Sequence, residues 1–398
     1  MFPAKNRLWQ PSEIRFVVLI ICYTNETGKW FKLFAEDSMT VHFVTFRGKP
    51  ALAAHYYDWS LVMPIKGRKP STAFKIGYRF LREIPNTAEG KVIVKILPKK
   101  GIGQIRWIES CGWRATHPFV FSLADHNAKG APSESDHLNE YPVSLLDEIW
   151  RCAKPCLKTY SPSLSCVHVT PGGELRASDG KYAFGIQTPF TFDAGEKSLI
   201  RSCELFGKKY LRREKSFRMG FAENTVHFDF GLFHFFSKPN VERYPDLNKV
   251  FSSDDTTQTR LTLDPKDAAF LKKHLDELPG RKDRDSPVTL LCEYDGTISA
   301  HGETPRSDET KAVLLVRSKY EGDAYVLRMN RNHLRQALSL GCLDFRFGTS
   351  YPFASTENIR ICWMPLDTCG ALPLESECPR NPVVLLRSDQ PSTKKEQK

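Results

Sequence analysis

The sequence has no long hydrophobic run. Its longest apolar stretch, Phe16–Tyr23, is far shorter than the roughly 20 residues that a membrane-spanning helix needs. No small-residue cleavage site of a secretory signal follows it. We therefore expect the protein to stay in the cytoplasm.

Motifs of enzymes and metal sites are also missing. The 11 cysteines are scattered and form no C-x-x-C pair, so we expect reduced, buried thiols rather than a zinc site. The G-x-x-x-x-G-K-[ST] phosphate loop, the G-x-S-x-G nucleophile turn and the H-E-x-x-H zinc motif do not occur. We therefore expect no catalytic residue, no metal and no cofactor.

One set of residues leaves a metal-dependent enzyme as an alternative. His227 and Asp229 fall on one face of the predicted strand VHFDF, and His234 follows shortly after. A metal-dependent phosphodiesterase needs several carboxylates or histidines around one or two ions, and no convincing third and fourth ligand accompanies these residues. A metal-dependent DNA-processing enzyme is therefore the less favoured alternative.

The order of the predicted elements indicates an α+β protein. Strand-like alternation in TVHFVTF and ALAAHYY is separated by a turn at residues 47–50, and KVIVKILP and GQIRWIES pair across residues 99–101. Because strands come in hairpins rather than singly between helices, the sheets should be antiparallel. A chain of 398 residues suits three domains of roughly 100–150 residues each.

Five helices are predicted from caps and apolar spacing. The clearest begins with Asp264 as N-cap, Pro265 at the first helical position and Asp267 in the first turn. The others cover residues 71–84, residues 144–155 with Ser144 as cap, the Leu199–Phe206 stretch and residues 330–341. We place domain boundaries at 1–127, 128–143 (a connector), 144–254, 255–370 and 371–398, the last a flexible tail.

Positive charge recurs on these predicted helices. The formal net charge of +11 suggests a polyanionic partner, although a single cationic helix face usually means a solvated surface. Cations on helices of all three predicted domains are better explained if those helices share one lining. The cations concerned are Lys75, Arg79, Arg82, Arg151, Lys154, Arg201, Lys208, Lys209, Lys272, Lys273, Arg331 and Arg335.

Four segments, in a fixed order, carry a resemblance to a known family. SDGKYA from Ser178, RYPDLNKV from Arg243, MNRNHLRQAL from Met329 and CWMPLD from Cys362 resemble the TDG-H-R-L-A, FPDYRRV, VN-x-x-Y-L-x-x-AL and V-V-MP-M-R stretches of the bacterial DNA polymerase III β sliding clamps. The resemblance implies three repeated DNA-clamp domains, with antiparallel sheets outside and helices lining a ring. The cations above would then face duplex DNA without reading its sequence.

The resemblance also implies a cleft for partner peptides. Polymerases, repair proteins and the clamp loader would dock short hydrophobic motifs there. Lys181 and Tyr182 stand where the family has His-Arg, and Asp367 stands where it has Arg, so peptide preference is expected to differ. The cleft would use Leu164, Ser178, Gly180, Lys181, Tyr182, Ala183, Pro245, Val250, Cys362, Met364, Pro365 and Leu366. Ordinary core and turn positions are the alternative reading.

By this resemblance the protein is a non-catalytic replication processivity factor, a homodimeric ring associated with the bacterial nucleoid. The likeness is firmest from about Leu145 to Asp367 and loosest over the first seventy residues, which would form half of each subunit contact. The alternative is a divergent accessory clamp that binds a private partner without closing a ring. The segment ALPLE from Ala371 is expected to fold back and compete for the cleft.

Overall fold

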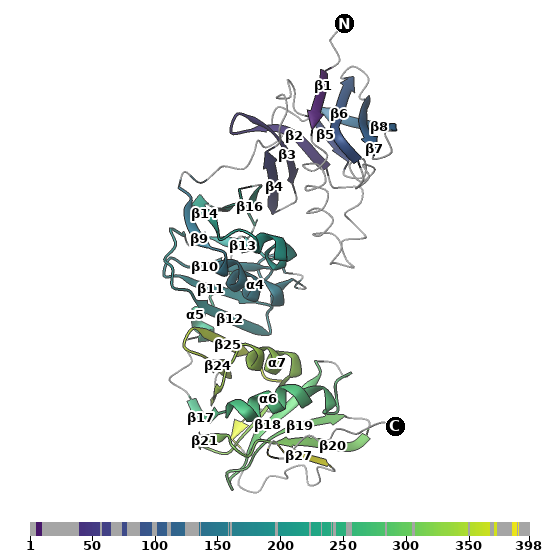
Figure 1. The fold of residues 1–398 in the computed structure, drawn as a ribbon. Helices are drawn as coiled ribbons and strands as arrows, with labels where there is room; N and C mark the ends of the chain where they lie inside the picture. The colour runs from purple at the N-terminus through teal and green to yellow at the C-terminus, as the bar shows by residue number, and fades with distance from the viewer. Residues whose placement is uncertain are drawn as a thin grey trace. The chain divides into compact units, whose positions relative to one another are not determined.

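The computed structural model describes residues 5–9, 40–55, 58–64, 74–77, 88–97, 102–109, 113–123, 135, 137–157, 159, 161–195, 198–222, 224–231, 233–239, 241, 244–251, 257–282, 285–304, 307–348, 351–366, 370–371, 384–387 and 389. The chain divides into two units (Figure 1). Unit 1 contains Met1–Leu175 and Pro189–Tyr244, and unit 2 contains Arg176–Thr188 and Pro245–Lys398. The division into three domains at 1–127, 144–254 and 255–370 remains a prediction.

Unit 1 is built on a 12-stranded sheet whose neighbouring strands all pair antiparallel. This arrangement confirms the predicted antiparallel, hairpin-rich α+β class. The strands, in spatial order, are β1 (Lys5–Trp9), β6 (Ala88–Leu97), β7 (Ile102–Glu109), β8 (Arg114–Leu123), β5 (Phe74–Gly77), β2 (Thr40–Phe46), β3 (Lys49–His55), β4 (Trp59–Pro64), β16 (His234–Ser237), β15 (Thr225–Asp229), β14 (Ser216–Ala222) and β9 (Asn139–Pro142).

The predicted turn between β2 and β3 is a two-residue hairpin. Phe46 pairs with Lys49, and the two residues between them, Arg47 and Gly48, have φ values of 47° and 73°. Positive φ at both positions matches the right-handed twist of the flanking strands, and glycine adopts it without a steric cost. The predicted hairpin of KVIVKILP and GQIRWIES is also present, with Leu97 opposite Ile102.

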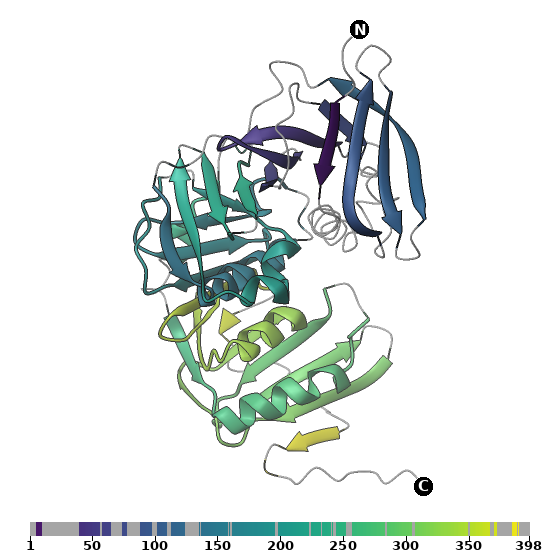
Figure 2. The same cartoon turned by 45° about the horizontal axis from the view of Figure 1, so that its top comes forward.

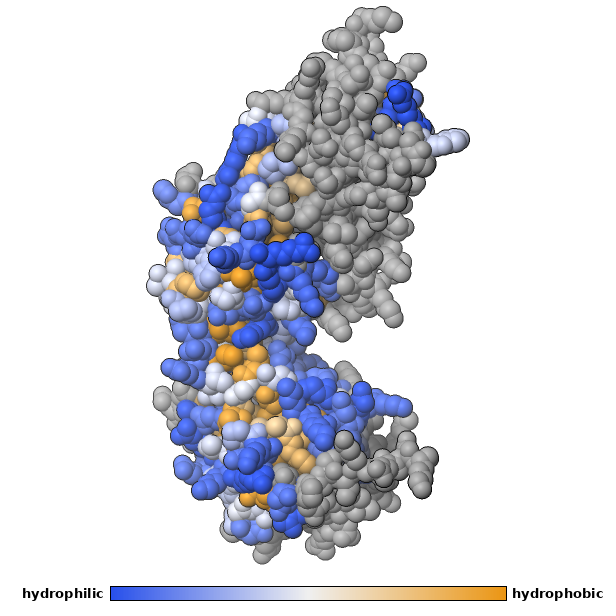
Figure 3. Space-filling model, in the orientation of Figure 1, coloured by the Kyte–Doolittle hydropathy of each residue, from blue (hydrophilic) through white to orange (hydrophobic). Residues whose placement is uncertain are grey.

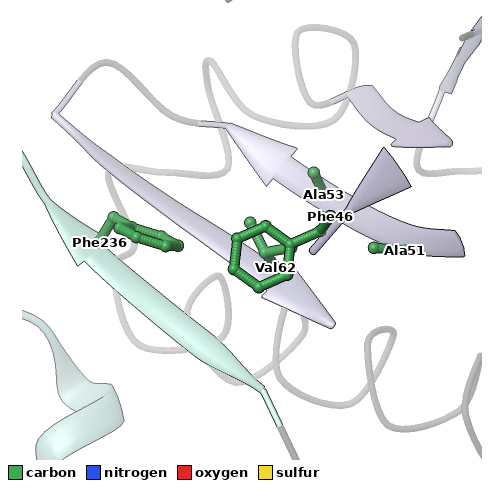
Figure 4. Packing of buried hydrophobic residues seen from close by; sticks show 5 residues of the cluster. All are labelled: Phe46, Ala51, Ala53, Val62 and Phe236. Carbon is green, nitrogen blue, oxygen red and sulfur yellow. The ribbon is translucent and has the colours of Figure 1, made fainter. Parts of the chain in front are cut away.

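A hydrophobic cluster joins strands that are far apart in the sequence. Phe46, Ala51, Ala53 and Val62 from β2, β3 and β4 pack with Phe236 of β16, and all five are at most 2% exposed (Figure 4). Strand β16 pairs with β4 along the same stretch, with His234 opposite Val62. Burial of aromatic and aliphatic surface therefore stabilises the pairing of β4 with β16, which joins the Met1–Leu175 and Pro189–Tyr244 segments of unit 1.

Two helix predictions in unit 1 are wrong. Residues 74–77 form strand β5 between β2 and β8, and buried Phe74 and Ile76 alternate with half-buried Lys75 and Gly77. This two-residue period is typical of a strand. Leu199–Arg201 form strand β13, which the 3-10 helices η3 (Glu204–Gly207) and η4 (Lys209–Arg212) follow. Residues 78–84 of the first predicted helix lie outside the described residues.

The helix predicted at 144–155 is confirmed as α4 (Ser144–Cys156). Val143 rather than Ser144 occupies the N-cap position, and no side chain caps the helix there. The apolar face of α4, which includes Leu145, Ile149 and Cys152, is fully buried. Strand β10 (Cys166–Val169) pairs with β13, and β11 (Glu174–Ser178) carries the chain from unit 1 into unit 2.

Unit 2 holds two sets of strands. One is a six-stranded sheet in the order β26 (Gly370–Ala371), β22 (Tyr325–Asn330), β18 (Pro287–Cys292), β19 (Ile298–Thr304), β20 (Ser307–Leu314) and β27 (Val384–Arg387). The other runs β12 (Tyr182–Gln187), β25 (Ile359–Trp363), β24 (Phe353–Ser355), β23 (Asp344–Gly348), β17 (Thr257–Thr262) and β21 (Lys319–Gly322). Both sets place hairpin neighbours beside each other, as predicted.

The helices of unit 2 begin where their caps predict. Asp264 accepts a hydrogen bond from the Lys266 amide (2.8 Å) at the start of α6 (Pro265–His274), which η6 (Leu275–Glu277) extends. Asn330 accepts one from the Asn332 amide (2.9 Å) at the start of α7 (Arg331–Ser339). Helices α6 and α7 pack side by side (Figure 2), and the short helix α5 (Asn248–Phe251) lies against β25.

The C-terminal region is not the wholly flexible tail that composition predicts. Ala371 pairs with Tyr325 as part of β26, and Val384–Arg387 pair with β20 as β27. The remainder of the ALPLE segment lies outside the described residues. Among the described helices, none combines the length and the apolar character needed to cross a bilayer.

Candidate partner cleft and cationic helices

A tight turn between β11 and β12 carries the residues predicted for one side of the cleft. Ser178 Oγ accepts from the Gly180 amide (3.1 Å), and Asp179 Oδ1 accepts from the Lys181 amide (2.9 Å). Gly180 has φ of 92°, a value that favours glycine because residues with a Cβ rarely adopt it. These bonds hold Lys181 at the tip of the turn, where it is exposed.

Strand β25 brings the C-terminal part of the predicted cleft to this turn. Tyr182 pairs with Trp363 and Ala183 with Cys362, and the Met364 amide donates to the Lys181 carbonyl (2.8 Å). The Cys362 thiol of β25 also lies 3.9 Å from the Val250 carbonyl of α5. Segments separated by more than a hundred residues therefore meet around β25.

The side chains of this set divide by exposure. Met364 is 50% exposed and is the apolar group that a ligand can reach most directly. Pro245, Val250, Pro365 and Leu366 are half-buried, and Gly180 is exposed. Ser178, Tyr182, Ala183 and Cys362 are buried and form the layer beneath. Leu164 lies in unit 1, and Asp367 lies outside the described residues.

Two residues beside this turn were missed by the sequence reasoning. Lys181 Nζ forms an ion pair with Asp285 Oδ1 at 2.8 Å, and the Tyr182 ring stacks on His333 with centroids 5.0 Å apart. Burial lowers the pKa of His333, so the ring is neutral near pH 7. His333 stands at the Tyr position of the VN-x-x-Y-L pattern, and this substitution was the available signal. Nothing in the local sequence connects Asp285 to Lys181.

Five of the predicted DNA-facing cations are exposed on helices. They are Arg151 and Lys154 on α4, Lys209 on η4, and Lys272 and Lys273 on α6. Hydrophilic residues cover most of the described surface on the face shown in Figure 3. These five are the cations of the predicted set that a polyanion can approach from solvent.

Three further cations are engaged with acidic side chains. Arg201 Nη1 lies 3.0 Å from Asp58 Oδ2, and Arg201 stands on strand β13 rather than on a helix. Lys208 Nζ lies 3.4 Å from Glu204 Oε2, and Arg335 hydrogen-bonds Asp276. Contact with phosphates would have to compete with these pairs.

Arg331 and Lys75 correct the predicted DNA-facing set. Arg331 is 1% exposed, and its guanidinium donates to the carbonyls of Leu278 (2.8 Å), Pro279 and Pro287 (3.1 Å). A buried cation bonded in this way joins α7 to the neighbouring loops. Lys75 lies on strand β5, opposite His42, not on a helix. Arg79 and Arg82 lie outside the described residues.

The three residues considered as metal ligands, His227, Asp229 and His234, lie close together and form a hydrogen-bonded cluster. His227, Asp229 and His234 are at most 4% exposed. His227 Nε2 lies 3.1 Å from His234 Nδ1, which lies 3.8 Å from Asp229 Oδ1. Arg218 hydrogen-bonds Asp229, and Arg47 Nη1 lies 3.9 Å from it. No group of three or more His, Cys, Asp or Glu within the described part of the chain is arranged to hold a metal ion, this cluster included.

Burial and the neighbouring charges set the protonation of this cluster. Burial, together with His234 and Arg47, lowers the pKa of His227 to about 3, and the ring stacks on Phe236 at 4.2 Å. Burial alone would raise the pKa of Asp229, but the Gly231 amide, His234 and Arg218 bring it below its usual value. The cluster therefore consists of a neutral His227 beside an ionised Asp229 at neutral pH.

This pKa shift predicts a pH dependence of stability. An unfolded histidine binds a proton near pH 6.5 and folded His227 only near pH 3, so the free energy of unfolding falls as the pH drops through that window. Between pH 7 and pH 5, the free energy of unfolding of the parent should fall by on the order of 1–2 kcal/mol more than that of His227→Gln. Urea unfolding at the two pH values measures this difference. The exposed His117→Gln is the matched control. Equal slopes for His227→Gln and the parent would contradict the assignment.

No protein-family model and no curated protein matches the sequence. Solved structures, however, match nearly its whole length. The Bacillus subtilis DNA polymerase sliding clamp is 14% identical, with a TM-score of 0.66 over 92% of this chain and 100% of that chain. The C. crescentus β sliding clamp is 14% identical with a TM-score of 0.69, over the same 92% and 100%.

A third match carries a bound ligand. The Pseudomonas aeruginosa sliding clamp bound to griselimycin is 11% identical to this chain, with a TM-score of 0.64 over 92% of this chain and 100% of that chain. The likeness spans the complete length of each of these structures, so it concerns the whole architecture rather than one domain. The chain therefore has the fold of the bacterial sliding clamp, the β subunit of DNA polymerase III.

Proposed function

We propose that this protein is a DNA sliding clamp that closes with a second copy into a ring around duplex DNA. The observation that carries the proposal is the match to complete sliding clamps over 92% of the chain. Each copy would contribute both units, and two head-to-tail contacts would close the ring. The protein would act as a non-catalytic processivity factor in the cytoplasm.

The exposed cations support contact with DNA. Arg151 and Lys154 stand opposite the buried face of α4, and Lys272 and Lys273 are exposed on α6. Lysine and arginine on helix surfaces attract phosphates without reading bases, so binding would be independent of sequence and sensitive to salt. Nearby acidic residues such as Asp276 would keep the attraction weak enough for sliding.

The surface around Met364 supports the docking of partner peptides. An exposed thioether next to half-buried Pro365 and Leu366 gives an apolar, adaptable contact. The Lys181–Asp285 ion pair lies at the turn beside it. A polymerase or repair protein held there would gain effective concentration at the template, and loading would need a separate ATP-driven loader.

The proposed ring predicts retention that depends on DNA topology. Protein loaded on nicked circular plasmid by a clamp loader should remain bound in gel filtration and leave when the plasmid is linearised. The physical reason is that a closed ring slides off free ends but leaves a circle only when an interface opens. Loss from circular and linear DNA at the same rate would refute encirclement, and a stable monomer in native mass measurement would favour the divergent clamp without a ring.

The α6 cations predict part of the salt dependence. Lys272→Ala with Lys273→Ala should reduce the slope of log K against log [salt] for duplex DNA by about 1–2, since each lost phosphate contact removes close to one unit. Lys238→Ala with Lys319→Ala removes two exposed lysines outside any helix and is the matched control. An unchanged slope in the α6 variant, measured by fluorescence anisotropy, would remove α6 from the DNA surface.

The Met364 surface predicts a charge-sensitive ligand site. Griselimycin, which the Pseudomonas aeruginosa clamp binds, is a suitable probe. Met364→Glu should weaken its binding by about tenfold or more, because a carboxylate must be desolvated against an apolar ligand. Met364→Leu keeps the apolar volume and should bind within about threefold of the parent. Equal affinity of Met364→Glu and the parent in calorimetry would exclude Met364 from the site.

A further inference from the structure

One carboxylate in unit 2 lies against two arginines that come from different elements. Asp276 on η6 accepts a hydrogen bond from Arg335 of α7, and its Oδ1 also lies 3.5 Å from Arg281 Nε in the turn that follows η6. All three side chains are partly exposed, at 46% for Asp276, 33% for Arg335 and 65% for Arg281. A solvent-accessible carboxylate thus holds two guanidinium groups together at the surface.

The buried Arg331 fixes the elements that carry these groups. Its guanidinium donates to the carbonyls of Leu278 and Pro279, the two residues that follow η6. Arg331 and Arg335 are four residues apart on α7 and so lie on one side of that helix. The same side of α7 therefore holds the turn after η6 through a buried arginine and contacts Asp276 through a partly exposed one.

Exposed lysines stand on either side of this segment in the sequence. Lys272 and Lys273 are exposed in the last turn of α6, directly before η6, and Lys282 is exposed directly after Arg281. The stretch from Lys272 to Lys282 holds four lysines and arginines and two carboxylates. A polyanion drawn to the lysines would be repelled locally at Asp276 unless that carboxylate gave up its partners.

Exchange of the carboxylate for a phosphate costs little. Ion pairs of partly exposed side chains contribute little to stability, because water solvates the separated charges well. A guanidinium group matches a phosphate at least as well as a carboxylate, since its donors form two parallel hydrogen bonds with the phosphate oxygens. Two arginines that already converge on one carboxylate also lose little further conformational freedom when they converge on a phosphate.

We propose that Asp276 stands in for a phosphate group of DNA, and that Arg281 and Arg335 transfer from Asp276 to one backbone phosphate when duplex DNA binds. The proposal rests on the proposed contact of the clamp with DNA, and it adds Arg281 to the DNA-facing residues. Asp276 is a positioning residue: it orders both guanidinium groups before DNA arrives, and it lowers the affinity because its ion pairs must separate. The pairs re-form between successive phosphates, which suits a sliding protein.

The test is the duplex affinity of the full chain with Asp276 neutralised. Asp276→Asn should bind a labelled linear duplex roughly 2- to 10-fold more tightly than the parent in fluorescence anisotropy, because no ion pair then has to separate. Glu277→Gln is the matched control. It removes the same charge one residue away, from a carboxylate that lies 2.9 Å from His274 Nδ1. A gain in Asp276→Asn no larger than that in Glu277→Gln would overturn the exchange.

A second set of variants identifies the groups that receive the phosphate. Arg281→Gln with Arg335→Gln should reduce the slope of log K against log [salt] by about 1, for one lost phosphate contact. In this background Asp276→Asn should bring no further gain, since the arginines that it frees are gone. An equal gain with and without the arginines would show a general charge effect and refute the transfer. Thermal unfolding checks that each variant keeps its fold.

Retention of the parent on circular plasmid separates this proposal from the proposed ring. If the parent is retained and the variants show no coupling between Asp276 and the arginines, the exchange is refuted and the clamp still stands. A parent that binds neither circular nor linear duplex DNA overturns both.

Discussion

Backbone hydrogen bonding between strands that are distant in the sequence is the constraint on which the rest of this structure depends. Strand β16 pairs with β4 across more than 170 residues of chain and so unites the 12-stranded sheet. Strand β25 pairs with β12 and brings Met364 to the Lys181 turn. The backbone groups of each strand must be paired with another strand or hydrated by solvent.

Hydrogen bonds and ion pairs within the protein also determine which cations are accessible at the surface. Arg331 satisfies three carbonyl groups from inside the protein, and Arg201 and Arg335 meet acidic partners. Lys272 and Lys273 remain exposed on α6. The net charge of +11 already counts the acidic partners of Arg201 and Arg335, so these contacts change which cations are accessible at the surface and not the net charge.

The candidate cleft combines rigidity with one adaptable group. Hydrogen bonds fix the Ser178–Lys181 turn, and the Met364 amide is tied to it, while the Met364 side chain is half exposed. Tyr182 and His333 stack beneath. The Lys181–Asp285 ion pair places charged groups at the turn beside Met364. Lys181 and Tyr182, which stand where the resembling stretch has His-Arg, therefore contribute to the polarity of this surface.

The sequence by itself determined the local elements. Asp264 and Asn330 cap their helices through bonds two residues away, and Arg47-Gly48 closes its hairpin, because these signals act over a few residues. The four ordered segments likewise led to the clamp fold. Only the tertiary structure decided that Phe74–Gly77 is a strand, that Arg331 is buried, and that the tail contributes β27. Those outcomes depend on burial and on pairing partners tens to hundreds of residues away, which no local pattern encodes.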